Sequence, residues 1–149
     1  MKYYRYEEFK TDTNKLIKMT KEFKPDAIVA IARGGLTLGH AMAEGLELRE
    51  IQTLRTELYD DKLKRESLSI FGTCSFQKGK KVLVVDDISD SGKTLREIMD
   101  FLISTNTDVE FKSVTLFYKE TSIYEPHYWI NKADDWINFF WDTDFIDKT

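Results

Sequence analysis

The stretch of sequence that decides the fold is VLVVDDISDSGKT, residues 82–94. Its first part, 82–85, is a continuous apolar run of the kind typical of a strand buried on both faces of a sheet. The run ends directly in Asp86 and Asp87, and a small polar loop then leads into a helical pattern. Because adjacent carboxylates repel each other, we expect a cation or another positive group beside this pair.

Three other segments have the composition of strands. AIVAIA at 27–32 is a second continuous apolar run, and an Arg-Gly-Gly turn at 33–35 follows it. IQTL at 51–54 is a short strand candidate. VEFKSVTLFY at 109–118 is rich in β-branched and aromatic residues, which favour strands.

Helical periodicity separates these strands. It covers 5–23, where Pro25 closes the segment, and about 37–44, where Gly45 is a plausible C-cap. A third amphipathic helix is predicted after residue 94 from Leu95, Ile98, Met99 and Leu102, at i, i+3, i+4 and i+7. Strands alternating with helices predict a single α/β domain over residues 1–149, with a mostly parallel central sheet flanked by helices. In such folds ligands bind at the carboxyl ends of the strands.

Composition narrows the class of partner. The chain has 149 residues and a formal net charge of -4, with charges spread along its length rather than gathered in a basic block. This pattern disfavours nucleic acid or an anionic membrane and favours a small molecule. A single cysteine, Cys74, fits a reducing compartment, and no His/Cys cluster suggests zinc. The N-terminus lacks an apolar signal core and no stretch reaches a membrane span, so we expect a cytoplasmic protein.

The segment 55–78 does not fit the alternation. It is charged, only weakly periodic and longer than most connections in compact domains. Such a segment is either a functional lid or a β-hairpin or surface loop without a role of its own.

Spacing excludes two familiar designs for acids after an apolar strand. A Walker A loop needs a glycine five positions before Gly92, and Asp87 stands there instead. A response-regulator receiver domain would need several more βα units after the acidic pair than this chain has. A third design, a sugar-phosphate site, remains. Small and hydroxyl residues at 89–94 run into a helix N-terminus that favours an anion, while Asp86 and Asp87 can accept ribose hydroxyls and face Mg²⁺.

These residues resemble a known motif. VLVVDDISDSGKT is similar to the phosphoribosyl diphosphate binding motif of the type I phosphoribosyltransferases, and IARGGL at 31–36 resembles the turn that meets the pyrophosphate in that family. The resemblance implies a pyrophosphate site at Arg33, Gly34 and Gly35, although Arg-Gly-Gly alone would be an ordinary turn. It implies that the ribose 5-phosphate and its hydroxyls are bound by Asp86, Asp87, Ser89, Asp90, Ser91, Gly92, Lys93 and Thr94.

The C-terminal third narrows the resemblance. LFYKE at 116–120 and DDWINFFWD at 134–142 resemble bacterial xanthine-guanine phosphoribosyltransferases. In those enzymes a lysine meets the purine 6-oxo group and a tryptophan covers the base, which implies a purine site at Lys119, Trp136, Ile137 and Asn138. Trp136 taken alone would be a core or interface aromatic, and Trp129 and Trp141 are expected to pack.

The resemblance implies a reaction. A 5-phosphoribosyl group would pass from phosphoribosyl diphosphate to N9 of guanine, xanthine or hypoxanthine, with Mg²⁺ as cofactor at Asp86 and Asp87. Asp90 would exchange a proton with purine N7, although a carboxylate there could also serve only the helix dipole. The segment 55–78, with Tyr59, would act as the lid over the pyrophosphate. In the type I phosphoribosyltransferase fold that the resemblance implies, the terminal segments would form a small hood, with about 119–142 over the base. Family members generally assemble, so a homo-oligomer, dimer or tetramer, is expected, with Tyr3, Tyr4, Phe139 and Phe140 as candidate contacts.

Three positions depart from the family pattern. The lid pair is Leu58-Tyr59 where Ser-Tyr is usual. Asn138 stands two residues after the tryptophan, where an acid able to hold a 2-amino group is expected, and an amide could serve several bases. Ser91 replaces threonine but keeps the hydroxyl.

Two other functions remain compatible with the motif. One is a regulator with the same fold that binds nucleotides or RNA without turning over a purine, and the other is a transferase for adenine or a pyrimidine. The absence of a basic block disfavours RNA binding. Lys119 and the aromatic C-terminal segment favour a 6-oxopurine.

Overall fold

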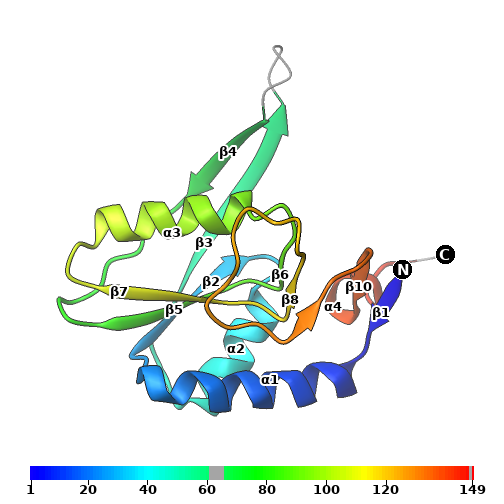
Figure 1. Ribbon diagram of the computed structural model, residues 1–149, viewed down its shortest axis with the longest axis horizontal. Helices are drawn as coiled ribbons and strands as arrows, with labels where there is room; N and C mark the ends of the chain where they lie inside the picture. Colours follow the sequence, from blue (N-terminus) through cyan, green and yellow to red (C-terminus); the bar gives the residue numbers. More distant parts are fainter. Residues whose placement is uncertain (61–65, 148) are drawn as a thin grey trace.

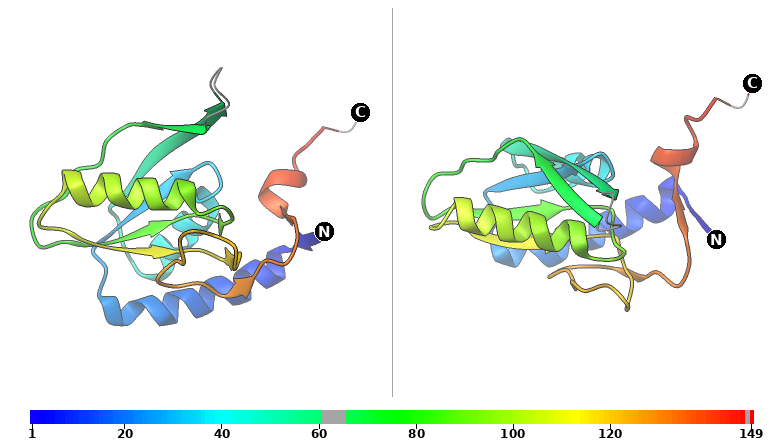
Figure 2. Two further views of the ribbon diagram at one scale, coloured as in Figure 1. Left: turned by 45° about the horizontal axis from the view of Figure 1, so that its top comes forward. Right: turned by 90° about the horizontal axis from the view of Figure 1, so that it is seen from above.

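The computed structural model describes residues 1–60, 66–147 and 149 (Figure 1). A central sheet lies between helices, and a smaller assembly of short strands stands at one end, where both termini lie (Figures 1 and 2). In chain order the elements are β1 (Lys2–Tyr4), α1 (Tyr6–Thr20), the 3₁₀ helix η1 (Lys21–Phe23), β2 (Ala27–Ala32), α2 (Leu36–Gly45), β3 (Ile51–Asp60), β4 (Glu66–Phe71), β5 (Lys81–Val85), β6 (Ile88–Ser89), α3 (Lys93–Thr105), β7 (Glu110–Val114), β8 (Phe117–Tyr118), β9 (Asn131–Lys132), β10 (Ile137–Phe139) and α4 (Phe140–Thr143).

The central sheet confirms the predicted α/β class. Its strand order is β4-β3-β2-β5-β7, with β2, β3, β5 and β7 parallel and β4 antiparallel at one edge. The two continuous apolar runs form the central strands β2 and β5, which pair directly with each other. They are central because both faces of these strands can be covered without placing a polar side chain in the core.

Successive residues of these strands pack on opposite faces. Ile28 and Leu83 lie in one apolar cluster with the buried side chains of α1 and α2. Val29 and Val84 lie in a second cluster with the apolar stripe of α3, which consists of Leu95, Ile98, Met99 and Leu102. The predicted helical spacing of that stripe is therefore confirmed, and α3 covers one face while α1 and α2 cover the other (Figure 1).

Two predicted elements have different bounds. The strand predicted at 51–54 extends to Asp60 as β3, and the strand predicted at 109–118 is interrupted after Val114. There the Leu116 N–H donates to the Asp87 carbonyl at 3.1 Å, so the chain leaves the central sheet. It then pairs as β8 with β6 and β9 in a separate sheet of order β6-β8-β9. Gly45, expected as a C-cap, is instead the last residue of α2, and Leu46 takes the cap position.

The hood is built from both ends of the chain. β1 and β10 pair in parallel, with Tyr4 opposite Phe139. Tyr4, expected to be an exposed contact, is only 1% exposed, and Phe139 is also buried. The Tyr4 ring packs edge-on against Phe117 and Phe139, with centroids 5.0 and 5.8 Å away. Trp141 stacks on Phe139 at 4.8 Å, which confirms its predicted packing role.

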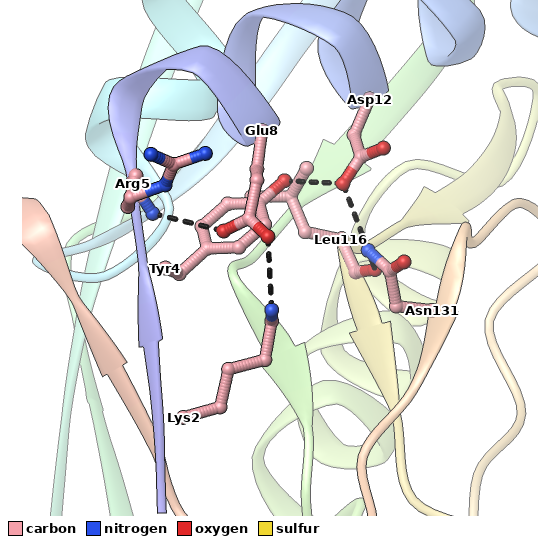
Figure 3. Close-up of polar contacts among 7 residues, drawn as sticks. All are labelled: Lys2, Tyr4, Arg5, Glu8, Asp12, Leu116 and Asn131. Atoms are coloured by element: carbon pink, nitrogen blue, oxygen red, sulfur yellow. Dashed lines mark hydrogen bonds and ion pairs between the residues drawn. The ribbon is translucent and has the colours of Figure 1, made fainter.

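A buried polar cluster ties the hood to the body (Figure 3). The Tyr4 hydroxyl donates to Asp12 Oδ2 on α1 at 2.6 Å, and the Asn131 Nδ2 donates to the same oxygen at 2.9 Å. Asn131 Nδ2 also reaches the Leu116 carbonyl at 3.2 Å, just before β8. Burial of the hydroxyl and its bond to Asp12 raise the pKa of Tyr4, so it is a permanent donor. Elements from both ends of the chain, β1 and α1 on one side and β9 on the other, are thus fixed at one carboxylate.

The segment 55–78 contains a β-hairpin, one of the two structures anticipated for it. β3 pairs with β2 as far as Arg55, opposite Ala32, and beyond that point only with β4. The hairpin therefore projects past the carboxyl edge of the sheet (Figure 1). The Arg55 guanidinium lies 4.1 Å from the centroid of the Phe71 ring, and this contact links β3 to β4 at the base of the hairpin. Arg55 also forms an ion pair with Glu57 on its own strand. Tyr59 lies opposite Ser67 in the backbone register, and its side chain lies outside the described part of the chain.

Candidate active site

The site lies where β2 and β5 end side by side. Ala30 is opposite Val85 in the register, so the Arg33–Gly35 turn and the Asp86–Asp87 pair meet at one edge of the sheet. The contact is close because Gly34 and Gly35 of the turn have no side chains. A Cβ on Gly34 would overlap the Asp87 carboxylate, and one on Gly35 would lie 3.0 Å from Asp86 Cα. The two motifs chosen from the sequence are therefore in direct contact, and the peptide bond joining Ala32 to Arg33 is cis.

The two aspartates are half-buried and close together. The Asp87 N–H donates to Asp86 Oδ1 at 2.9 Å. Burial, followed by the neighbouring charge of Asp87, raises the pKa of Asp86. Burial likewise raises the pKa of Asp87 to about 6, with a further rise from the charge of Asp142. A site that pushes two carboxyls toward protonation favours a positive ligand, as the repulsion between them predicts.

A cavity of about 180 Å³ lies at the start of α3. It is lined by the residues after β5 and by the first turn of the helix, where amide groups lack partners within the helix. Such an arrangement binds phosphate well. The lining residues are Asp86, Asp87, Ile88, Ser89, Asp90, Ser91, Gly92, Thr94 and Leu95.

The loop 89–92 is supported by the segment 119–124. The Ile123 N–H donates to the Ser91 carbonyl at 2.9 Å, and the Lys119 N–H donates to the Ser89 carbonyl at 3.1 Å. Gly92 has a φ of 85° and caps α3. A Cβ there would lie 2.7 Å from the Tyr124 nitrogen, so only glycine allows this approach.

A second cavity, of about 190 Å³, adjoins the first. Asp87, Ile88 and Asp90 line both. Its other walls come from the residue after β8 and from the hood, so both halves of the predicted purine site reach it. These walls are formed by Lys119, Ala133, Asp135, Trp136, Ile137, Phe139 and Asp142.

Lys119 and Asp90 face each other in this second cavity. The Lys119 Nζ lies 3.6 Å from Asp90 Oδ1. Both side chains remain about half exposed, at 43% and 56%, so the pair is accessible to a ligand. The ammonium can donate to a carbonyl, and the carboxylate can accept a proton or an N–H.

Asn138 does not lie in this cavity, which corrects the expectation that it contacts the base. Ile137 and Phe139 line the cavity, and side chains alternate along a strand, so the residue between them faces the other way. Asn138 instead lines a separate hollow together with Tyr3, Thr143, Asp144 and Ile146.

Three other residues predicted to bind substrate either make hydrogen bonds within the protein or lie outside the cavity lining. The Ser89 hydroxyl is buried and donates to the Tyr124 carbonyl at 2.7 Å. The Gly35 N–H donates to the Ile31 carbonyl at 2.8 Å. Lys93 is an exposed first residue of α3 and lies outside the lining of the phosphate-sized cavity.

Asp142 is the functional candidate that the sequence analysis missed. It belongs to α4, which brings it back to the cavity wall six positions after Trp136 instead of the two that were expected. Its charge acts on Asp87 across the site. The signal available in the sequence was an acid at the end of the aromatic run NFFWD, residues 138–142.

Comparison with known proteins decides the family. The model of the phosphoribosyl transferase domain matches residues 3–146, nearly the whole chain. The chain belongs to the phosphoribosyltransferase family. A curated relative, a xanthine-guanine phosphoribosyltransferase from Idiomarina loihiensis, is 27% identical over 118 residues, which cover 77% of this chain and 70% of the relative.

Solved structures agree with this assignment. A xanthine-guanine-hypoxanthine phosphoribosyltransferase from Helicobacter pylori has a TM-score of 0.89 and 33% identity, covering 96% of this chain and 94% of its own. A purine phosphoribosyltransferase from Pyrococcus horikoshii has a TM-score of 0.87 and 25% identity, covering 99% and 97%. The protein is therefore a type I phosphoribosyltransferase, and it is similar to the xanthine-guanine enzymes.

The acidic pair of this phosphoribosyltransferase fits a hard divalent cation. Carboxylate oxygens are the preferred protein ligands of Mg²⁺, which usually retains several waters and binds substrate phosphates. Among the described residues, no group of three or more His, Cys, Asp and Glu side chains is placed to hold a metal. The remaining ligands at Asp86 and Asp87 would therefore come from water and substrate.

No helix within the described part of the chain is long and apolar enough to cross a membrane.

Proposed function

We propose that this phosphoribosyltransferase transfers the 5-phosphoribosyl group of phosphoribosyl diphosphate to N9 of a 6-oxopurine (guanine, xanthine or hypoxanthine) in cytoplasmic purine salvage. The observation that carries the proposal is the pair of adjoining cavities, one at the start of α3 and one between Lys119 and Trp136, with Asp87, Ile88 and Asp90 in both walls. A sugar phosphate in the first and a base in the second would meet at these shared residues.

The first cavity would hold the donor. The 5-phosphate would accept from amides and hydroxyls at the start of α3, from Ser91, Gly92 and Thr94. Asp86 and Asp87 would accept ribose hydroxyls and hold Mg²⁺, which when bound would neutralise the pyrophosphate. Because the Ser89 hydroxyl already donates to Tyr124, we assign Ser89 the role of holding the loop. The exposed Lys93 would supply positive charge near the phosphate.

The pyrophosphate would lie against the Arg33–Gly35 turn. Arg33 is exposed and carries a permanent positive charge, and Gly34 lets the turn approach Asp87 closely. Because the Gly35 N–H is bonded within the turn, this binding rests mainly on Arg33 and Gly34. The β3–β4 hairpin, which projects at the same edge of the sheet, would close over the pyrophosphate with Leu58 and Tyr59 and exclude water from the cationic ribose.

The second cavity would hold the base. The Lys119 ammonium would donate to the 6-oxo oxygen, Asp90 would exchange a proton with N7, and Trp136 and Ile137 would cover the ring. Asp142 would accept from donors on the far edge of the base. A permanent donor at Lys119 favours a 6-oxo group over the 6-amino group of adenine, because an amino group cannot accept a hydrogen bond from it at comparable strength.

A single assay tests the proposal. The purified protein is incubated with phosphoribosyl diphosphate and Mg²⁺ and with guanine, xanthine, hypoxanthine or adenine in turn, and nucleotide formation is followed by absorbance. Turnover of at least one 6-oxopurine and little turnover of adenine is expected. Activity with adenine alone would contradict the assignment, and a wild type inert toward all four bases while still binding nucleotide would favour a regulator.

A further inference from the structure

Trp136 is an exposed ring with a fixed orientation. The residue is 65% exposed although it lines the second cavity. Its backbone is anchored on β1, since the Lys2 N–H donates to the Trp136 carbonyl at 3.0 Å, and its own N–H donates to Asp135 Oδ1 at 2.7 Å. Within the described residues, no other aromatic ring is recorded stacking on the indole, so backbone anchoring alone would leave the side chain able to rotate.

One side-chain bond fixes the indole. Trp136 Nε1 donates to Asn138 Oδ1 at 2.9 Å. An indole N–H can only donate, so the oxygen of the amide must face it. Asn138 is held in turn by the β1–β10 pairing, where it lies opposite Tyr3. It reaches the indole from the face of β10 that points away from the cavity.

We propose that Asn138 is a positioning residue that pre-orients the Trp136 ring for stacking on the base. The inference rests on the proposed purine site and assigns Asn138 a different role from contact with the purine. Holding the indole N–H on the outer face leaves the flat face of the ring to the cavity. An aromatic ring ordered before binding loses less conformational freedom when the base arrives, which lowers the KM of the base without changing the chemistry.

The first test needs no enzyme activity. The chain has 3 tryptophans, so ¹⁵N-labelled protein gives three indole N–H signals, and Trp136→Phe identifies the one that matters. In Asn138→Leu that signal is expected to shift and to show faster internal motion on the ps–ns timescale. Asn138→Asp keeps an acceptor at the same place and is expected to preserve the order of the indole. An unchanged Trp136 signal in Asn138→Leu overturns the proposal.

The second test is kinetic. Asn138→Leu is expected to raise the KM of the purine about three- to tenfold, with the KM of phosphoribosyl diphosphate and kcat unchanged. Asn138→Asp is expected to rescue the KM and to leave the ratio of guanine to hypoxanthine turnover unchanged, because this side chain faces away from the base. A changed ratio in Asn138→Asp, or an unchanged purine KM in Asn138→Leu, contradicts the proposal.

Two further variants separate positioning from general damage. In a Trp136→Phe background, where the donor is missing, adding Asn138→Leu is expected to change the purine KM no further, since the pair acts as a unit. Asn14→Leu makes the same chemical change on the exposed side of α1 and is expected to leave both KM values unchanged. If the wild type turns over no purine, both the proposed function and the role of the Trp136 ring in stacking on the base are wrong. In that case the indole signals still report whether the bond exists, so the two failures are distinguishable.

Discussion

The Lys119 ammonium and the Asp90 carboxylate form an ion pair of 3.6 Å inside the cavity that we assign to the base. Each neutralises the other while the cavity is free of purine. A 6-oxopurine offers each of them a new partner, since its carbonyl accepts from the ammonium and its imidazole edge can exchange a proton with the carboxylate. The two residues are therefore coupled before and after binding, and their variants should affect different kinetic constants.

Replacing Lys119 with methionine should weaken binding of the base. The variant keeps the length of the side chain but loses the charged donor, and hydrogen bonds to charged groups are worth roughly 1.5–3 kcal/mol, or about 10- to 150-fold. We expect the KM of guanine and hypoxanthine to rise within that range and discrimination against adenine to fall. Steady-state kinetics with each base measures both effects. Lys132→Met removes an exposed lysine paired with Glu120 and should change neither.

Replacing Asp90 with asparagine should reduce kcat far more than donor binding. General acid–base groups contribute about 10²–10⁴-fold, and asparagine keeps the size of the side chain but cannot take the proton. Titration calorimetry with phosphoribosyl diphosphate and Mg²⁺ should show nearly unchanged affinity. If kcat were preserved, Asp90 would serve only the dipole of α3. Asp100→Asn, an exposed change on the same helix, is the matched control.

Removing Mg²⁺ should abolish turnover. The half-buried pair Asp86–Asp87 has two like charges and needs a cation to remain ionised beside a pyrophosphate. Dialysis against EDTA is expected to eliminate nucleotide formation, and Mg²⁺ in excess of the chelator should restore it, whereas NaCl at equal ionic strength should not. Full activity in EDTA would show that the acidic pair does not need a metal ion for turnover.

The parts of the fold that the sequence predicted well are those with local patterns. The runs 27–32 and 82–85 are apolar throughout, and this composition is compatible only with burial on both faces, so they became the adjacent central strands. Because parallel neighbours end at the same edge, the motifs that follow them had to meet. The apolar stripe of α3 from Leu95 to Leu102 was also predictable, because its spacing is visible within one short stretch of sequence.

The resemblance implied a small hood, but the strand pairing that builds it could not be predicted because its pattern is not local. β1 and β10 are three-residue strands from opposite ends of the chain, and only their pairing buries Tyr4 and Phe139. Asn138 was expected in the cavity because the family pattern places a base-contacting residue two positions after the tryptophan, whereas the strand β10 turns this side chain to its other face. Asp142 reaches the site through a four-residue helix, α4, that has no sequence periodicity.

The Tyr4 hydroxyl should contribute measurably to stability because it is buried. Tyr4→Phe removes a hydrogen bond to the Asp12 carboxylate and leaves Asp12 Oδ2 with Asn131 as its partner. We therefore expect the free energy of unfolding to fall by about 1–3 kcal/mol. Tyr3→Phe removes an equivalent bond to Asp144, but at an exposed position, and should cost less than about 0.5 kcal/mol. Urea denaturation of both variants measures the difference. Equal losses of free energy of unfolding in the two variants would mean that burial of the Asp12 cluster contributes nothing to stability.

Stability should also depend on pH through His127. The Ser113 N–H donates to His127 Nδ1 at 2.9 Å, so this nitrogen must be an acceptor and the imidazole must be neutral. Partial burial of the ring, followed by the charge of Lys112, lowers the pKa of His127 below its ordinary value of 6.5. A lowered folded pKa means that the unfolded chain binds the proton more readily. The contribution of His127 is therefore complete above pH 6.5 and is lost as pH falls through the lower folded pKa.

His127→Asn isolates this effect. The amide oxygen of asparagine can accept from the Ser113 N–H in place of Nδ1, and it does not titrate. We expect the wild type to lose more of its free energy of unfolding than the variant between pH 7.5 and pH 5.5, because carboxylate titrations are common to both proteins and cancel in the comparison. Urea midpoints at the two pH values give the difference. Parallel pH dependence in the two proteins would show that protonation of His127 does not oppose folding.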